Sequence, residues 1–256
     1  LFAHDRIAAL LRSAFRSQPD AVEIREASRE AGPGYGRAAR VSADPARVFD
    51  RLDREPRWIN VQHVERLDSD WQALHRAIIA DLGVHAAEMR PGVRDSGSFL
   101  LLSSPGIQVH FHADPDQSFL SQIRGSKRVF LFPASAVSQP ELEALARTED
   151  HASVTWREAF AAVAFPPVEL RPGQTAFLPL YAPHRVENGP DEPSVSLSVG
   201  FHTTRSRQRK LVHLVNDRAR HAGLTPRGFG ESRLVDAAKA RLHLGLRACD
   251  RLTGHR

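Results

Sequence analysis

A histidine and a carboxylate stand two positions apart at His112-Ala-Asp114. Side chains at i and i+2 of a β-strand point to the same face of the sheet, so both groups can bind one metal ion if this segment is a strand. A third ligand from another strand would complete a set of two histidines and one carboxylate. Such a set occupies one face of an octahedral Fe(II) ion and leaves three positions open for other ligands.

The spacing of a histidine and an acidic residue is not specific by itself. The chain holds 13 histidines and 30 acidic residues in 256 positions, so such pairs arise by chance. Two are present, His112 with Asp114 and His63 with Glu65. The second pair lies between a short expected strand and an expected helix, without the flanking pattern described next. We interpret it as a structural pair at the surface.

The wider sequence around His112 is more informative. Four segments follow one another along the chain: His112-Ala-Asp, Gln122-Ile-Arg-Gly-Ser-Lys-Arg, Pro172-Gly-Gln and Pro183-His. Taken together over 98–202, they resemble the JmjC/cupin-like family of Fe(II)- and 2-oxoglutarate-dependent oxygenases. Within that family they look most like the asparaginyl hydroxylase that inhibits hypoxia-inducible factor and like bacterial cupin-like hydroxylases.

The resemblance implies roles for five side chains. His112, Asp114 and His184 match the family's iron ligands. Lys127 matches the lysine that pairs with the distal carboxylate of the cosubstrate 2-oxoglutarate, and a carboxylate in a dry pocket does need a charge-assisted partner. Ser118 stands where the family often has an asparagine near that cosubstrate.

Three neighbouring residues leave alternatives open. Arg124 and Arg128 are alternative cations for the role of Lys127. Successive side chains of a strand alternate between its two faces, so either the odd-numbered or the even-numbered residues of a strand face the interior, not both. His110 would share a strand face with His112. We interpret His110 as a packing or supporting residue, with a role as ligand in place of Asp114 as the alternative.

The sequence also departs from the family pattern. Val109 stands where the family commonly has a threonine hydroxyl near the cosubstrate, and Gln174 replaces the usual aspartate of the Pro-Gly turn. Ser196 or Ser198, on the last expected strand, is our guess for the missing hydroxyl.

The elements that must position these residues are short strands between helical regions. Strands are expected at 58–61, in the run 98–112 with a break at Pro105-Gly106, and at 122–124, 127–132, 168–170, 175–180 and 194–201. Helices are expected at 5–15, from Pro45, at 68–80 with Gly83 ending the helix, near Pro140, from Thr155, at 210–222 and at 232–252. Short strands between Gly and Pro turns indicate a sandwich or small barrel.

We therefore predict a mainly β protein with flanking α-helices, and the resemblance implies a double-stranded β-helix of the cupin or jelly-roll type. The expected organisation is a mostly helical region at 1–90, with one strand, that packs on the core. A JmjC/cupin-like catalytic core follows at 91–204, with a helical insertion at 134–168. A basic helical region at 205–256 completes the chain.

Composition limits the remaining possibilities. Hydrophobic residues make up 41% and charged residues 25% of the chain, as in ordinary globular proteins. No apolar run is long enough to span a bilayer, and the single cysteine, Cys249, excludes a disulfide framework. We expect a cytoplasmic protein. From Thr203 onward 13 basic residues face 4 acidic ones. We interpret this surplus mainly as a solvated helical face and consider nucleic acid an unlikely partner.

The function that the resemblance implies is Fe(II)- and 2-oxoglutarate-dependent oxygenation, with hydroxylation of a peptide or protein side chain, or of a small molecule. Two alternatives stay open: a non-catalytic cupin-like binding module that uses its basic C-terminal helices, and a cupin metalloenzyme that does not use 2-oxoglutarate.

Two further expectations concern surfaces. An apolar stripe in the last expected helix predicts either a homodimer interface or packing against the barrel: Leu234, Ala238, Leu242 and Leu246. Several histidines outside the expected strands are interpreted as ordinary surface residues, among them His75, His85, His213 and His243.

Overall fold

The computed structural model describes residues 1–29, 39–86, 89, 92–148 and 154–253, with side chains up to 246. The boundary expected between residues 90 and 91 and the side chain of Cys249 lie outside these residues.

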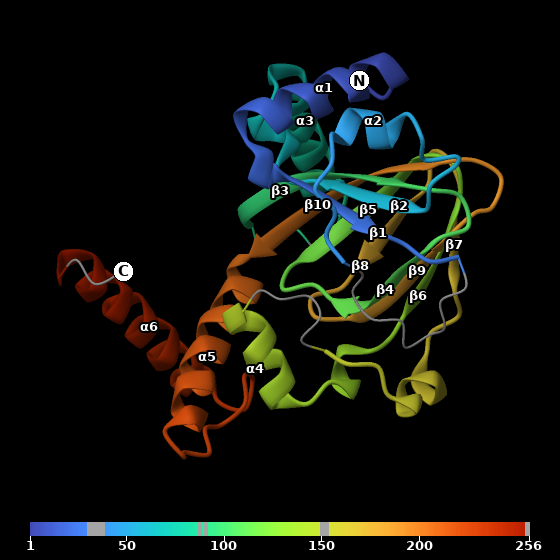
Figure 1. Ribbon diagram of the computed structural model, residues 1–256. Helices are drawn as coiled ribbons and strands as arrows, with labels where there is room; N and C mark the ends of the chain where they lie inside the picture. The colour runs from blue at the N-terminus through green and yellow to red at the C-terminus, as the bar shows by residue number, and fades with distance from the viewer. Residues whose placement is uncertain (30–38, 87–88, 90–91, 149–153, 254–256) are drawn as a thin grey trace.

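Two antiparallel β-sheets pack face to face and form a cupin-like sandwich (Figure 1). The larger sheet contains, in spatial order, β1 (Val22–Glu26), β2 (Arg57–Val61), β3 (Val93–Ser103), β10 (Ser194–Thr203), β5 (Gln117–Arg124) and β8 (Thr175–Leu178). The smaller sheet contains β4 (Gln108–Ala113), β9 (Pro183–Asn188), β6 (Lys127–Leu131) and β7 (Val168–Leu170). The predicted fold class, mainly β with flanking helices, is confirmed.

Helices lie on two sides of the sandwich (Figure 1). They are α1 (His4–Ser17), α2 (Pro45–Phe49), α3 (Ser69–His85), α4 (Gln139–Thr148), α5 (Thr204–His221) and α6 (Arg233–Thr253). The first three cover the outer face of the larger sheet, and the last three gather at one end of the molecule. The described residues include no helix that is both long and apolar enough to cross a lipid bilayer.

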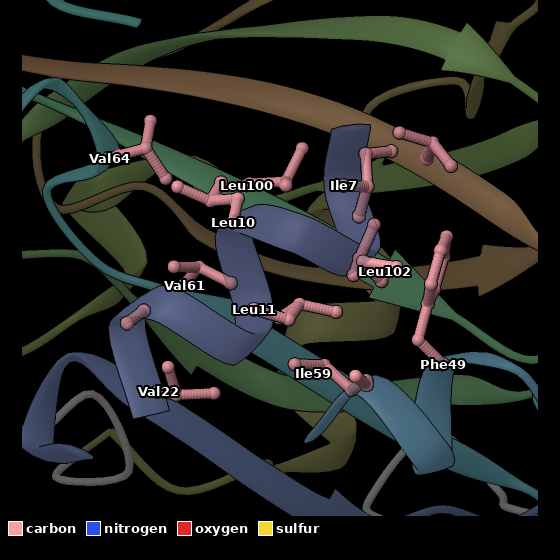
Figure 2. Close-up of a cluster of buried hydrophobic side chains, with 14 of the residues drawn as sticks. Ile7, Leu10, Leu11, Val22, Phe49, Ile59, Val61, Val64, Leu100 and Leu102 are labelled. Atoms are coloured by element: carbon pink, nitrogen blue, oxygen red, sulfur yellow. The ribbon is translucent and has the colours of Figure 1, made fainter. Parts of the chain in front are cut away.

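The outer face of the larger sheet is buried by α1, as Figure 2 shows. Ile7, Leu10 and Leu11 recur at helical spacing on one face of α1 and are almost fully buried. They belong to one apolar cluster with Leu100 and Leu102, which alternate along β3 and have no exposed surface. Each such side chain contributes roughly 1.5–3 kcal/mol by leaving water. This packing fixes the sheet that forms one wall of the site.

The last strand, β10, has one apolar and one polar face, as its alternating sequence predicts. Its valine and leucine side chains, Val195, Leu197 and Val199, belong to the same outer cluster. Its serines point inward, where Ser196 donates to the Gln122 side chain at 2.7 Å and Ser198 faces the space between the sheets. Polar groups on the inner face of a buried sheet indicate a site rather than a core.

Three expectations about secondary structure are wrong in detail. The N-terminal region supplies two strands to the larger sheet instead of one, because β1 pairs with β2 along its whole length. Helix α3 continues through Gly83 to His85. The helix expected from Thr155 is only a 3-10 segment at Glu158–Val163. It is followed closely by Pro166, and the residue before a proline disfavours helical backbone.

Candidate metal centre

Three potential metal ligands converge where β4 and β9 pair. His112 on β4 lies directly opposite His184 on β9, and Asp114 follows the end of β4. Nε2 of His112 and Nε2 of His184 each lie 3.7 Å from a carboxylate oxygen of Asp114. One ligand atom from each residue can be chosen so that all three lie within 4.8 Å of one another. The antiparallel register thus brings together two histidines that are 72 positions apart in sequence.

The two histidines are held in the orientation that metal binding requires. Nδ1 of His112 lies 2.7 Å from the carbonyl oxygen of His110, and Nδ1 of His184 lies 3.1 Å from that of Ala182. A carbonyl oxygen only accepts, so each Nδ1 carries the proton and each Nε2 keeps its lone pair for a metal. Metal-bound histidines in proteins are typically oriented by such a second hydrogen bond. The donor set fits Fe(II), which prefers two histidines and one carboxylate.

The loop before β9 is anchored to both the metal centre and the C-terminal helices. The Tyr181 amide donates to the carbonyl oxygen of Asp114 at 3.3 Å. Tyr181 has a left-handed backbone (φ 62°), and its side chain is fully buried. Its ring meets the imidazole of His213 on α5 edge-on at 5.4 Å. Packing therefore holds a conformation that is unfavourable for a residue with a side chain.

A cavity of about 540 Å³ lies between the two sheets and contains the three potential ligands. Lys127 and Ser118 line the same cavity, and both are buried. Burial lowers the pKa of Lys127 to about 8. Within the part of the chain that the structure describes, neither the Lys127 ammonium nor the Ser118 hydroxyl has a hydrogen-bond partner. A buried cation and a buried hydroxyl that line one cavity are suited to an anionic ligand that accepts hydrogen bonds from both.

The two arginines that competed with Lys127 point away from the cavity. Arg128 pairs with Glu187 at 3.4 Å, and Arg124 pairs with Glu192 at 3.8 Å. Both arginine side chains are substantially exposed, whereas Lys127 is 3% exposed. On β6, alternation therefore turns Lys127 toward the cavity and Arg128 toward solvent.

The other residues weighed as cosubstrate contacts or ligands divide into two groups. His110, Val109 and Ser198 line the cavity. The His110 ring lies 4.8 Å from the His112 ring but is not a member of the cluster of potential ligands. The hydroxyl of Ser196 is directed to Gln122 instead, which leaves Ser198 as the cavity-facing serine of that strand.

Sequence reasoning missed the role of the second His-x-acid pair. His63 lines the cavity, and Glu65 behind it is buried, so the interpretation as a surface pair is wrong. One available signal was Gly97, directly before the expected strand run 98–112 and within β3 in the structure, because a glycine in a strand often marks the close approach of another group. Three further histidines expected at the surface are also buried: His75, His213 and His243.

Comparison with known proteins gives a match at the level of fold. No protein-family model matches the chain, and no curated protein matches it in sequence. The chain resembles the crystal structure of YcfD from Escherichia coli, with a TM-score of 0.52 and 18% sequence identity, over 95% of this chain and 59% of that one. A structure described as YcfD, a ribosomal oxygenase, in complex with cobalt and 2-oxoglutarate matches with a TM-score of 0.50 and 18% identity, over 95% of this chain and 58% of YcfD. The chain thus spans less than two thirds of the length of YcfD and shares the fold of the corresponding part.

Proposed function

We propose that this protein is an Fe(II)- and 2-oxoglutarate-dependent oxygenase that hydroxylates a peptide or protein side chain. The reaction consumes 2-oxoglutarate, dioxygen and substrate, and yields succinate, carbon dioxide and the hydroxylated substrate. The observation that carries the proposal is one cavity that contains a cluster of two histidines and one carboxylate together with a buried lysine, for which the described residues provide no anionic partner.

His112, Asp114 and His184 would hold the iron ion. When bound, iron supplies the one-electron and dioxygen chemistry that amino-acid side chains lack. The protein's own contribution is to fix both Nε2 atoms through the backbone carbonyls of His110 and Ala182. The strand that carries His112 is supported on its other face by a buried aromatic cluster around Phe111.

Lys127 and Ser118 would bind the carboxylate of 2-oxoglutarate that is remote from the metal. The ammonium supplies the countercharge, and the hydroxyl supplies a neutral donor. Both side chains are buried and, among the described residues, have no other partner. A dianionic ligand therefore supplies a hydrogen-bond acceptor to two groups that otherwise have none, which favours its binding.

The substrate class is inferred from the fold and from the extent of the cavity. The fold is similar to that of YcfD, described as a ribosomal oxygenase. The cavity extends from the metal cluster to residues of β2 and β3 and to Lys210 of α5, so its lining exceeds what 2-oxoglutarate would need. We infer that a peptide segment reaches the metal centre through this extension.

The proposal is tested by uncoupled turnover, which requires no knowledge of the substrate. Purified protein supplied with Fe(II) and 2-oxoglutarate is expected to release succinate slowly. The His112→Ala variant should abolish that release, and the His85→Ala variant, which alters an exposed histidine at the end of α3, should retain it. Absence of succinate from the wild-type protein, or equal release by His112→Ala, would contradict the proposal.

A further inference from the structure

One row of residues crosses the inner face of the larger sheet at the cavity. Gly97 on β3 is paired with Gly200 on β10, and Gly200 is paired with Ser118 on β5. Neighbouring strands are about 4.8 Å apart, so Gly97 lies about 10 Å across the sheet from Ser118. The cosubstrate residue Ser118 and Gly97 thus mark two separate parts of one cavity.

His63 fills the space above Gly97. A Cβ atom added to Gly97 would lie 2.5 Å from His63 Nδ1, which is too close for any other residue to replace this glycine without displacing the ring. The ring also packs on Phe99, with centroids 5.3 Å apart. His63 itself has a left-handed backbone (φ 52°), a conformation that residues with side chains rarely adopt. Strained backbone of this kind clusters at functional sites.

Glu65 holds the imidazole of His63 from behind. Strand β2 ends opposite Leu100, and no other strand among the described residues pairs with this edge of β3 beyond that point. The Ser98 amide donates to Glu65 at 2.9 Å instead. The other carboxylate oxygen lies 3.0 Å from His63 Nδ1. Burial alone would raise the pKa of Glu65, but the hydrogen bonds from His63 and Ser98 outweigh burial and lower it. The carboxylate is therefore ionised and accepts the Nδ1 proton.

The other nitrogen of His63 is left available to a ligand. Because Nδ1 carries the proton, Nε2 of the neutral ring is an acceptor. The side chain lines the cavity and is 37% exposed, and within the described chain Nε2 has no hydrogen-bond partner. Capping the edge of β3 requires only Glu65. It does not require an imidazole, a glycine beneath that ring, or a left-handed backbone.

We infer that His63 is a substrate-binding residue that accepts a hydrogen bond from the substrate side chain, an inference that rests on the proposed oxygenase function. The site selects side chains that carry an N–H or O–H donor over apolar side chains of the same size. Glu65 is the positioning residue that fixes the ring and its tautomer.

Peptide pools test this selectivity directly. Each pool has one fixed central residue among randomised neighbours, and succinate release is divided by the uncoupled rate of the same enzyme variant. Matched pools differ in the donor group but little in size: glutamine against methionine, asparagine against leucine, and threonine against valine. The wild-type protein is expected to favour at least one donor pool over its apolar match by roughly 5- to 10-fold, the effect of one neutral hydrogen bond.

The decisive variant is His63→Asn. Asparagine tolerates a left-handed backbone, and its amide can still donate to Glu65, but it lacks the atom at the Nε2 position. The preference should fall to within about 2-fold. His63→Gln, whose amide reaches toward the Nε2 position, should restore part of it, and the matched control His85→Asn should keep the wild-type preference.

Two results would overturn the inference. One is that the His63→Asn variant, shown by circular dichroism to be folded, keeps the wild-type preference for donor pools over apolar pools. The other is wild-type protein that releases uncoupled succinate but favours no donor pool, in which case the oxygenase proposal stands and the role of His63 does not. If the wild-type protein releases no succinate under any condition, the proposed function fails, and this inference fails with it.

Discussion

His112 and His184 lie directly opposite each other on β4 and β9, and each donates its Nδ1 proton to the carbonyl oxygen of the residue two positions earlier in the chain. The same local device thus orients both rings, and the register of a single strand pair brings their Nε2 atoms to the carboxylate of Asp114. The candidate metal centre therefore depends on the pairing of β4 with β9, with Asp114 directly after the end of β4.

The amount of metal bound by variants should distinguish the proposed ligands from the neighbouring residue His110. We expect Asp114→Ala to lose bound Fe(II), with a larger drop in affinity than the roughly 10- to 100-fold that loss of an outer hydrogen-bond partner costs. His110→Ala should retain the metal, because the bond to His112 comes from the backbone carbonyl of His110. Metal analysis after dialysis measures both. Retention by Asp114→Ala together with loss by His110→Ala would make His110 the ligand.

Binding of 2-oxoglutarate should depend on pH through Lys127. The pKa of this amine is about 8 because it is buried, so it is charged below that pH and becomes neutral above it. A bound carboxylate stabilises the charged form, so affinity should be highest below pH 8 and fall as the pH rises above 8, by up to about tenfold per unit. Isothermal titration with the metal-loaded protein measures this effect. Lys127→Arg should make affinity nearly constant over the same range.

Removing the charge at position 127 gives a complementary test. Lys127→Met should weaken 2-oxoglutarate binding by about 10- to 100-fold, the range expected for one charge-assisted hydrogen bond. Arg128→Met is the matched control, because its side chain points outward to Glu187, and it should change affinity by less than about 2-fold. If the two variants have the same effect, Lys127 is not the cosubstrate residue.

The stability of the protein should decrease in acid because of His213. Burial, with additional repulsion from Arg209 and Lys239, lowers the pKa of His213 to about 3. Its pKa in the unfolded chain is near 6.5, so the stabilising effect is fully present above that pH. The effect is lost as the pH falls from 6.5 toward 3, at about 1 kcal/mol per unit.

His213→Leu should flatten this pH dependence, even if loss of the acceptor for Arg209 lowers stability at neutral pH. Chemical denaturation at several pH values measures the slope, and His85→Leu, at an exposed position, serves as the control. An unchanged slope in His213→Leu would show that another group titrates.

The apolar stripe of α6 is not buried against the barrel. Leu234, Leu242 and Leu246 are 85%, 53% and 41% exposed, and α6 extends away from the sheets in Figure 1. Packing of this stripe on the barrel, one of the two expectations from sequence, is therefore wrong. The remaining expectation is a homodimer, and we expect light scattering to give twice the monomer mass and Leu242→Glu to give the monomer. A wild-type monomer at high concentration would contradict it.

The sequence predicted those parts of the structure that depend on the alternation of side chains along a single strand. Strand alternation indicated that His112 and Asp114 share a face and that Lys127 and Arg128 cannot, and the structure has both arrangements. Strand β1 was missed because its alternation of apolar and charged residues runs only from Val22 to Arg25 before Glu26 interrupts it, which is too short a pattern to indicate a strand by itself. Two of these charges, on Glu23 and Arg25, pair with each other on the strand.

The position of His63 could not be predicted because it depends on contacts between segments distant in sequence. Its ring is placed by Gly97, by Glu65 and by the point at which β2 stops pairing with β3. Nothing in the local sequence Gln-His-Val-Glu specifies any of these. The same holds for His213, whose burial follows from the docking of α5 against Tyr181.

The most direct test of the account is a crystal structure of the protein with Fe(II) and 2-oxoglutarate, grown without oxygen. We expect the metal to be bound by Nε2 of His112, Nε2 of His184 and the carboxylate of Asp114, with the remote carboxylate of 2-oxoglutarate hydrogen-bonded to Lys127. A metal bound elsewhere, or 2-oxoglutarate placed without contact to Lys127, would contradict the central claim.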